Sequence, residues 1–413
     1  MANTFLSPTM ITKEALRVLH NSLHFASTVT RSYDDSFANS GATVSGKIGP
    51  SLRIRKPNRY TVSTGPALSV QDTTEDYITL TVSTQKHVDM RFSTADLTLT
   101  IDQFSDRYIR PAALLLASTI DYDGLQKFLD IYNLVGVAGT NPGAGAAGTG
   151  ADAPAVFLNA SAYLSNYACP ESERTVVLNP FSQASAVTGL AGLFNPQAAI
   201  SRQYEQGTIG NALGMEFKMD QNVPRLTCGS RVLDTSTTFT SIDTTGTVWT
   251  CACTTGKTFA VGDVFSITTG TPVNTVNWET KKDTGTSQQF VVTAATTVST
   301  TATLTCSPAI ITSGATQTVT NAPDSSAVLT FVGVASTSYA QNLCYHKDAF
   351  ALATADLVLP KGVDMAAREV YDGISIRLVR QYDINNDNIV ARLDVLYGWV
   401  TQYAQLACRI IAK

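Results

Sequence analysis

Apolar and polar residues alternate through most of the stretch 52–92. Leu52 and Ile54 alternate with arginines, and the same two-residue period returns at 78–82 and 88–92. A period of two gives each strand one apolar face, so the pattern predicts a long β-hairpin arm. A two-stranded hairpin is marginal in water. We therefore expect the arm to bury its apolar face on a partner, and the partner we expect is another copy of the chain.

A helical period comes before this arm. In residues 12–29 the side chains of Leu16, Leu19 and Leu23 fall on one stripe, which predicts an amphipathic helix. Thr12 is the expected N-cap, since its hydroxyl can accept a hydrogen bond from the first turn. The polar residues that follow predict an irregular connector.

A second helix is predicted over residues 102–133, where apolar residues again recur at helical spacing. Pro111 and Gly124 are expected to bend or interrupt this helix. The Gly- and Ala-rich stretch 136–152 comes next and predicts a mobile loop.

The rest of the chain shows a mixed helical and strand pattern, then a purely β pattern, and then strands again. Residues 155–224 predict an α/β lobe, in which Asn179 and Asn195 each cap a helix that starts at the following proline. Residues 225–341 are rich in Thr and show short β runs separated by Gly and Pro, which predicts a compact barrel or sandwich. Strands of the lobe return in 346–413. The expected fold is therefore α+β, with an all-β insert inside the lobe.

Composition limits the classes of function. The chain has 413 residues, 15% of them charged, and a net charge of -4, which argues against tight, sequence-independent binding of DNA as the main activity. No apolar run approaches the ~18 residues of a membrane span. The N-terminal residues do not have the pattern of a secretory signal. We expect no membrane association, and we expect the seven cysteines to be reduced and mostly buried.

Two stretches superficially resemble ligand-binding motifs. Gly143, Gly145 and Gly148 match G-x-G-x-x-G, but no helix is predicted directly after them, so a flexible loop is favoured over a dinucleotide site. The four cysteines of the insert lack the paired spacing of a zinc site, and buried thiols are favoured. These cysteines are Cys228, Cys251, Cys253 and Cys306.

A third stretch has the ligand spacing of a calcium loop. Asp383, Asn385, Asp387 and Asp394 occupy its ligand positions, but Asn388 stands where the sharp turn needs Gly. The flanking residues alternate as strands, so a hairpin turn is favoured. No G-x-S-x-G, H-E-x-x-H or Walker A sequence is present, and the four His are scattered. The sequence predicts no enzyme, no cofactor and no catalytic or metal-binding residues.

The strongest local charge cluster lies on the predicted arm. It consists of Arg53, Arg55, Lys56 and Arg59. Contact with nucleic-acid phosphates is one interpretation. Docking on acidic groups of a neighbouring copy is favoured, because no aromatic stacking platform accompanies the cluster.

Five motifs in the first 113 residues resemble the major coat protein of P22-type tailed bacteriophages. They are TMITKEALRVLHNSL (9–23), YDDSFA (33–38), LRIRKPNRYTV (52–62), LSVQD (68–72) and DLTLTIDQFSDRYIRPAA (96–113). The resemblance continues in the order of the parts: an α/β lobe, a β insert, and a return to the lobe.

This resemblance implies the HK97-like coat protein fold, divided into five parts. They would be an N-terminal arm (1–31), an extended loop (46–93), a peripheral domain containing a spine helix (32–45, 94–137 and 361–413), an axial domain (138–224 and 345–360) and an insertion domain (225–344).

The resemblance also implies a function. The chain would be a major capsid protein that forms pentamers and hexamers of an icosahedral shell on a scaffolding protein. The shell would also contain a portal protein, in some phages a decoration protein, and the packaged double-stranded DNA. The protein would be found in the virion, and in the host cytoplasm during assembly.

Two residues of the first predicted helix, Glu14 and Arg17, are candidate contacts to the scaffold or to a neighbouring subunit. The alternative function is a shell protein of a non-viral nanocompartment, such as an encapsulin, which shares the fold. Packaged genomic DNA, rather than a cargo enzyme, would distinguish the phage coat from the nanocompartment.

Overall fold

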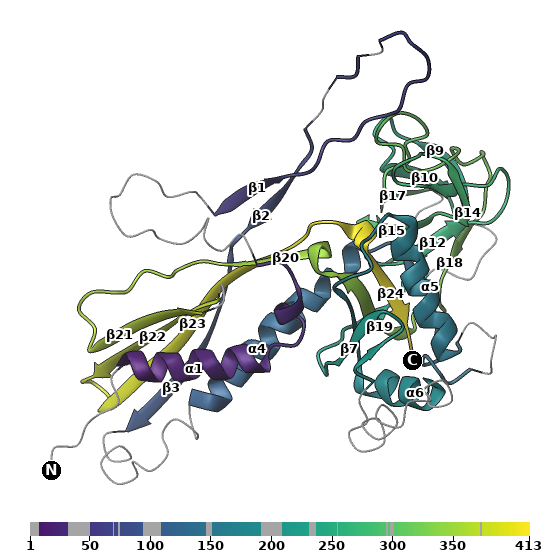
Figure 1. Ribbon diagram of the computed structural model, residues 1–413. Helices are drawn as coiled ribbons and strands as arrows, with labels where there is room; N and C mark the ends of the chain where they lie inside the picture. The colour runs from purple at the N-terminus through teal and green to yellow at the C-terminus, as the bar shows by residue number, and fades with distance from the viewer. Residues whose placement is uncertain are drawn as a thin grey trace. The chain divides into compact units, whose positions relative to one another are not determined.

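The computed structural model describes most of the chain and confirms a mixed α+β protein (Figure 1). The described residues are 8–31, 50–68, 70–72, 75–93, 109–145, 151–190, 209–230, 237–253, 255–294, 296–297, 301–371 and 374–413. The chain forms two compact units. The first unit comprises Met1–Lys56, Tyr77–Gly124 and Phe350–Gln402, and the second comprises Pro57–Asp76, Leu125–Ala349 and Tyr403–Lys413.

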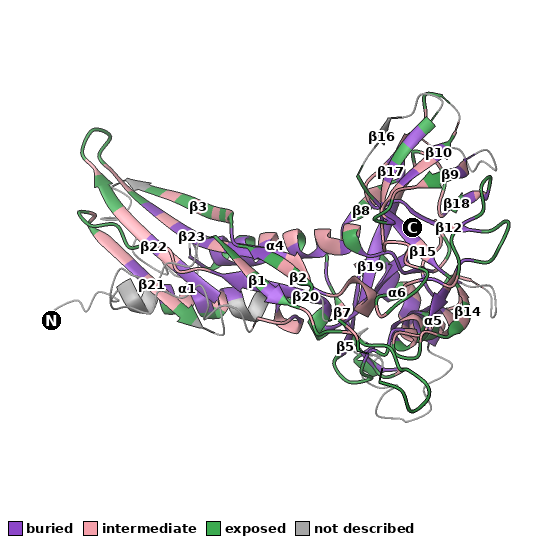
Figure 2. Ribbon diagram, turned by 90° about the horizontal axis from the view of Figure 1, so that it is seen from above, coloured by how far each residue is buried: buried purple, intermediate pink, exposed green. Residues whose placement is uncertain are grey.

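A five-stranded antiparallel sheet is the centre of the first unit. Strands β20, β23, β22 and β21 are neighbours in this order, and β3 also pairs with β23. Their bounds are β3 (Thr84–Ser93), β20 (Phe350–Thr354), β21 (Met365–Tyr371), β22 (Ile374–Asp383) and β23 (Asn388–Thr401). The predicted polar turn joins β22 to β23 and is mostly exposed (Figure 2).

The predicted hairpin arm is shorter than the sequence indicates. Only β1 (Ser51–Arg55) and β2 (Tyr77–Thr81) form a hairpin. The third stretch of alternation is β3, which pairs with β23 along its whole length. An alternating pattern fixes the apolar face of a strand but not its partner, and this is why the sequence misassigned β3.

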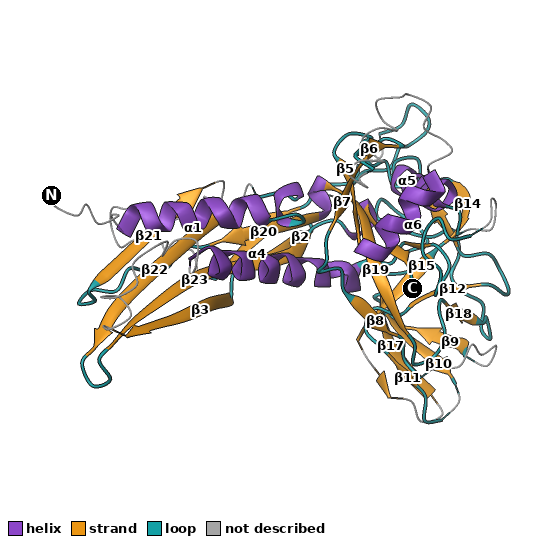
Figure 3. Cartoon of the chain, turned by 90° about the horizontal axis from the view of Figure 1, so that it is seen from below, coloured by secondary structure: helices purple, strands orange, loops and turns teal. Residues whose placement is uncertain are grey.

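Two helices lie along one face of this sheet (Figure 3). Helix α1 (Pro8–Ser22) contacts β21 and β22, with Ala15, Leu16 and Leu19 buried. The helix begins before the predicted cap, so Thr12 is a buried residue of the helix interior. A short 3-10 turn, η1 (Ala26–Thr28), follows in place of the predicted continuation.

Helix α4 (Arg110–Leu125) covers only the middle of the second predicted helix. Residues 102–108 lie outside the described part of the chain. Pro111 lies in the first turn of α4, where its missing N–H costs nothing. At Gly124 an added Cβ would lie 2.6 Å from the Trp399 ring, so glycine permits close packing there. The helix then tightens into the 3-10 segment η3 (Gln126–Asp130).

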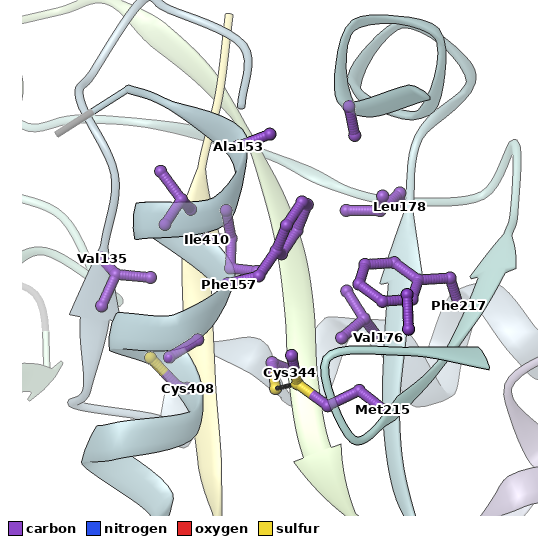
Figure 4. Packing of buried hydrophobic residues seen from close by; sticks show 14 of the residues in the cluster. Val135, Ala153, Phe157, Val176, Leu178, Met215, Phe217, Cys344, Cys408 and Ile410 are labelled. Atoms are coloured by element: carbon purple, nitrogen blue, oxygen red, sulfur yellow. Dashed lines mark hydrogen bonds between the residues drawn. The ribbon is translucent and has the colours of Figure 1, made fainter. Parts of the chain in front are cut away.

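The second unit contains a sheet with both parallel and antiparallel pairs of strands. Its order is β4-β24-β19-β5-β7-β6, with β8 paired to the far end of β19. The strands are β4 (Leu134–Val135), β5 (Arg174–Leu178), β6 (Asn211–Ala212), β7 (Met215–Met219), β8 (Arg225–Thr227), β19 (Ser338–His346) and β24 (Ala407–Ile411). Phe157 and Phe217 meet edge to face in its core at 4.9 Å between ring centroids (Figure 4).

Helices α5 (Ala153–Asn166) and α6 (Pro180–Leu190) supply further side chains to this core. The predicted cap of α6 is confirmed, since Asn179 Oδ1 accepts a hydrogen bond from the Ser182 N–H at 2.6 Å. The second predicted cap, Asn195, lies outside the described residues.

The Gly- and Ala-rich stretch departs from the prediction where it is described. Gly143, with φ +93°, donates its N–H to the Ala151 carbonyl at 2.7 Å and lies against the backbone of Ser185. This part is therefore packed against α6. A helix also follows the glycines, contrary to the prediction, because α5 begins at Ala153.

The all-β insert is confirmed as a closed barrel. Six strands follow the order β18-β12-β15-β17-β10-β9, and a bridge between Thr238 and Val328 joins the two ends of the row. Trp249 is fully buried among Phe239, Phe265 and Phe290. The barrel strands are β9 (Thr238–Ile242), β10 (Val248–Ala252), β12 (Val264–Ile267), β15 (Gln289–Ala294), β17 (Thr301–Ser307) and β18 (Leu329–Phe331).

Two small pairs of strands come between the barrel strands in the sequence. They are β11 (Thr258–Phe259) with β16 (Thr296–Thr297), and β13 (Asn274–Val276) with β14 (Asp283–Ser287). The remaining 3-10 turns are η4 (Lys347–Ala349) and η5 (Ala404–Leu406).

Candidate functional site

The base of the β1–β2 hairpin packs on its own chain. Ile54 and Leu80 are buried against Ala353 of β20, with Leu396 of β23 beside them. The expectation that this apolar face needs another copy is therefore wrong for the base of the hairpin. The approach to β23 is close, because a Cβ added at Gly398 would lie 2.1 Å from the carbonyl oxygen of Thr81.

The opposite face of the hairpin carries two of the candidate arginines. Arg53 and Arg55 are exposed, as the alternation predicts. The Arg53 guanidinium carbon lies 4.8 Å from the centroid of the Tyr77 ring on the paired strand. This contact is a cation–π pair on an exposed surface.

The residues after β1, from Pro57 to Asp76, belong to the second unit, and Arg59 is one of them. Its guanidinium carbon lies 3.6 Å from the ring centroid of Trp278, and Arg59 is only partly exposed. Burial lowers the pKa of Arg59. The premise that no aromatic platform accompanies the cluster is thus wrong. The four cationic residues are divided between the two units, since Arg59 belongs to the second unit and Arg53, Arg55 and Lys56 belong to the first.

On α1 the two candidate contact residues pair with each other. Arg17 Nε donates to Glu14 Oε2 at 2.9 Å, one helical turn away, and the side chains of Arg17 and Glu14 are 65% and 39% exposed. The hydrogen bond from Arg17 lowers the pKa of Glu14. Any partner that binds either residue must compete with an exposed ion pair, which is a weak interaction.

A buried acid that the sequence did not single out anchors the segment after α1. The Asp121 carboxylate on α4 accepts hydrogen bonds from the backbone N–H groups of His24, Phe25 and Ala26, at 2.7, 3.3 and 2.9 Å. Asp121 is 1% exposed. It thereby holds residues 24–26, directly after α1, on α4.

A second buried acid, Asp394, pairs with two arginines on the first sheet. It accepts hydrogen bonds from Arg377 Nη2 and Arg392 Nε, both at 2.6 Å, and from Gln85 at 3.2 Å. Burial alone raises the pKa of Asp394, but the two arginines outweigh it and lower the pKa. This carboxylate, which the calcium-loop spacing above places among the ligands, is thus held by two guanidinium groups.

The hairpin turn itself is confirmed as the better interpretation of that stretch. Asp383 accepts hydrogen bonds from the Asn385 N–H at 3.0 Å and from Asn386 Nδ2 at 2.7 Å. In the part of the chain that the structure describes, no group of three or more His, Cys, Asp or Glu side chains is placed to hold a metal ion.

All seven cysteines are free thiols, and only Cys253 is not fully buried. Burial raises the pKa of Cys251 to about 12 and that of Cys344 to about 12. The favoured interpretation of the cysteines of the insert as buried thiols is confirmed for Cys228, Cys251 and Cys306.

Among the described residues, no helix has the length and apolar character needed to cross a bilayer.

One comparison identifies the family. The family model described as "P22 coat protein - gene protein 5" matches residues 1–407 of the chain. The chain belongs to the P22 coat protein family. It is therefore a major capsid protein of a tailed phage, and its family consists of structural proteins that assemble into shells. No curated protein matches the chain.

Solved structures similar to this P22-family coat protein include three phage or particle proteins. "Mycobacterium phage Che8" is 12% identical with a TM-score of 0.48, covering 94% of this chain and 90% of its own. "Capsid structure of the Cyanophage P-SCSP1u" is 10% identical with a TM-score of 0.42, covering 91% of each chain. "Crystal structure of virus-like particle from Pyrococcus furiosus" is 8% identical with a TM-score of 0.39, covering 98% of this chain and 97% of its own.

Proposed function

We propose that this coat protein has the HK97-like fold and forms the pentamers and hexamers of an icosahedral shell, assembled on a scaffolding protein around a portal protein. The family match over residues 1–407 is the observation that carries the proposal. The parts would be the N-terminal arm (1–31), the extended loop (46–93) and the peripheral, axial and insertion domains with the bounds given above. Assembly would take place in the host cytoplasm, before DNA enters the shell.

Two surfaces are proposed to contact other subunits or the scaffold. One is the exposed face of the hairpin, with Arg55 and its neighbour Lys56. The other is the exposed face of α1, with Glu14 and Arg17. Both are charged and solvated in the single chain. Such charges contribute more to the choice and orientation of a partner than to affinity. Arg53 and Arg59 contact aromatic rings of their own chain, and their contribution to subunit contacts would be indirect.

Electron microscopy tests this proposal. The purified protein is mixed with and without its scaffolding protein, and particles are imaged in both samples. We expect closed shells of uniform diameter with scaffold, and irregular or no particles without it. A discrete small oligomer under both conditions would contradict the proposal. Particles from infected cells that contain a cargo protein instead of DNA would support a nanocompartment.

A further inference from the structure

The second unit contains a wall of aromatic side chains around Trp278. The Trp278 ring meets Tyr167 edge to face at 6.1 Å between centroids, and Tyr167 meets Tyr132 in the same way at 6.1 Å. The Tyr167 hydroxyl donates to Gln288 Oε1 at 3.1 Å. Tyr132 and Tyr167 are buried, so these rings give Trp278 a fixed support.

Arg59 occupies the outer surface of this wall. The distance of 3.6 Å from its guanidinium carbon to the centroid of the Trp278 ring is a stacking distance. Its sequence neighbours Asn58 and Tyr60 are exposed, whereas Arg59 is partly buried. Arg59 is thus the residue by which this part of the loop touches the wall.

The loop tip, Pro57–Asp76, has its own cross-link. The Gln71 side chain pairs with the backbone of Thr61, accepting from its N–H at 2.8 Å and donating to its carbonyl at 2.5 Å. The large apolar side chains of the tip point away from the protein. Tyr60, Val62, Leu68 and Val70 are 59%, 98%, 90% and 80% exposed. These apolar side chains therefore do not pack into a hydrophobic core, and the cation–π pair of Arg59 with Trp278 joins the tip to the wall.

The same ring carries a second cation. Lys281 Nζ lies 5.2 Å from the Trp278 centroid and donates to the Trp278 carbonyl at 2.7 Å. Two like charges on one ring repel each other, so Lys281 weakens the hold on Arg59. A stacked cation with a competing cation beside it forms a contact that is suited to release.

We propose that Arg59 and Trp278 form a releasable latch, which holds the loop tip on the aromatic wall of its own chain before assembly and makes Arg59 a positioning residue for the loop. The latch itself is a property of the single subunit. Only its role in assembly rests on the proposed function.

Tryptophan fluorescence of the unassembled subunit tests the latch. Trp249 and Trp399 are 0% and 9% exposed, so Trp278 dominates quenching by acrylamide, which is uncharged. Arg59→Gln should increase the quenching constant and speed chymotrypsin cleavage at Tyr60 and Leu68. The increase in cleavage should be roughly 2- to 30-fold, from the usual strength of a cation–π pair. Arg53→Gln is the matched control, because it removes the same charge from a pair outside the tip.

Three further variants separate a latch from a general loss of structure. Trp278→Phe and Arg59→Lys should each cleave at an intermediate rate, because each keeps a weaker cation–π pair. Lys281→Gln should cleave more slowly than the wild type, because it removes the competing charge. Equal quenching and cleavage for Arg59→Gln and Arg53→Gln, or faster cleavage of Lys281→Gln, would overturn the latch.

Assembly is measured separately by sedimentation of the same variants with scaffold. We expect Arg59→Gln to give fewer shells than Arg53→Gln. Wild-type yield from a subunit with a loosened tip would overturn the positioning role of Arg59 and leave the capsid function intact. Absence of shells from the wild type as well would count against the proposed function and not against the latch.

Discussion

At the scale of residues, two buried acids organise the first unit, and neither has a sequence signal of its own. Asp121 lies on α4 and accepts three backbone hydrogen bonds from a distant segment. Asp394 lies on a strand and pairs with two arginines. A single acid in either pattern is typical of a solvated position, so its partners become visible only when the fold brings the segments together.

Asp121→Ala should destabilise the coat protein by about 2–4 kcal/mol, because it leaves several buried N–H groups without an acceptor. Asp121→Asn keeps one acceptor oxygen at nearly the same volume and should cost roughly half as much. The midpoint of urea unfolding measures both variants. A wild-type midpoint for Asp121→Asn, with only Asp121→Ala destabilised, would show that the side chain fills space and does not anchor the segment after α1 through its carboxylate.

At the scale of elements, most of the predictions rest on local patterns and succeed. The cap at Asn179, the turn after β22 and the all-β insert follow from neighbouring residues, and the structure confirms all three. The failures concern partners that are far apart in sequence. The alternating pattern of β3 does not predict that β23 is its partner strand. Likewise, the residues next to Arg59 in the sequence do not predict its contact with Trp278. The sequence therefore predicted one basic cluster, whereas Arg59 belongs to a different unit from Arg53, Arg55 and Lys56.

The base of the hairpin makes one element-scale prediction possible. Gly398→Ala should lower stability by about 1–3 kcal/mol, because the new Cβ would overlap the backbone of β2 at Thr81. Hydrogen exchange should show faster exchange at Leu80 and Thr81. Ser83→Thr adds a carbon at an exposed position nearby and serves as the control. Unchanged exchange in Gly398→Ala would mean that the hairpin base does not lie against β23.

At the scale of the whole molecule, each compact unit is assembled from three separate stretches of chain. Their stability is expected to depend on pH in one direction. Several carboxylates have a lowered pKa in the folded protein; they are Glu14, Asp243, Asp324, Asp383 and Asp394. Asp394 is buried, whereas the other four are partly or fully exposed, so Asp394 should dominate the effect.

A lowered pKa means that the folded state binds protons less readily than the unfolded state. The stability from Asp394 is therefore fully present above about pH 4–5 and is lost as the pH falls through its folded pKa. The urea midpoint of the unassembled subunit should be flat from about pH 8 to pH 5 and fall below about pH 4. Asp394→Asn should be less stable at neutral pH and show a shallower acid decline. An acid decline of wild-type steepness in Asp394→Asn would assign the effect to other groups.

The position of β24 has a consequence for synthesis of the protein. Residues 407–411 follow every other strand in the sequence, yet β24 lies between β4 and β19 inside the second sheet. While the chain is still leaving the ribosome, β4 and β19 have emerged but the strand that separates them has not. That sheet can be completed only after synthesis has reached Ile411. Nascent or prematurely terminated chains therefore lack a finished second unit, which would keep incomplete subunits out of a growing shell.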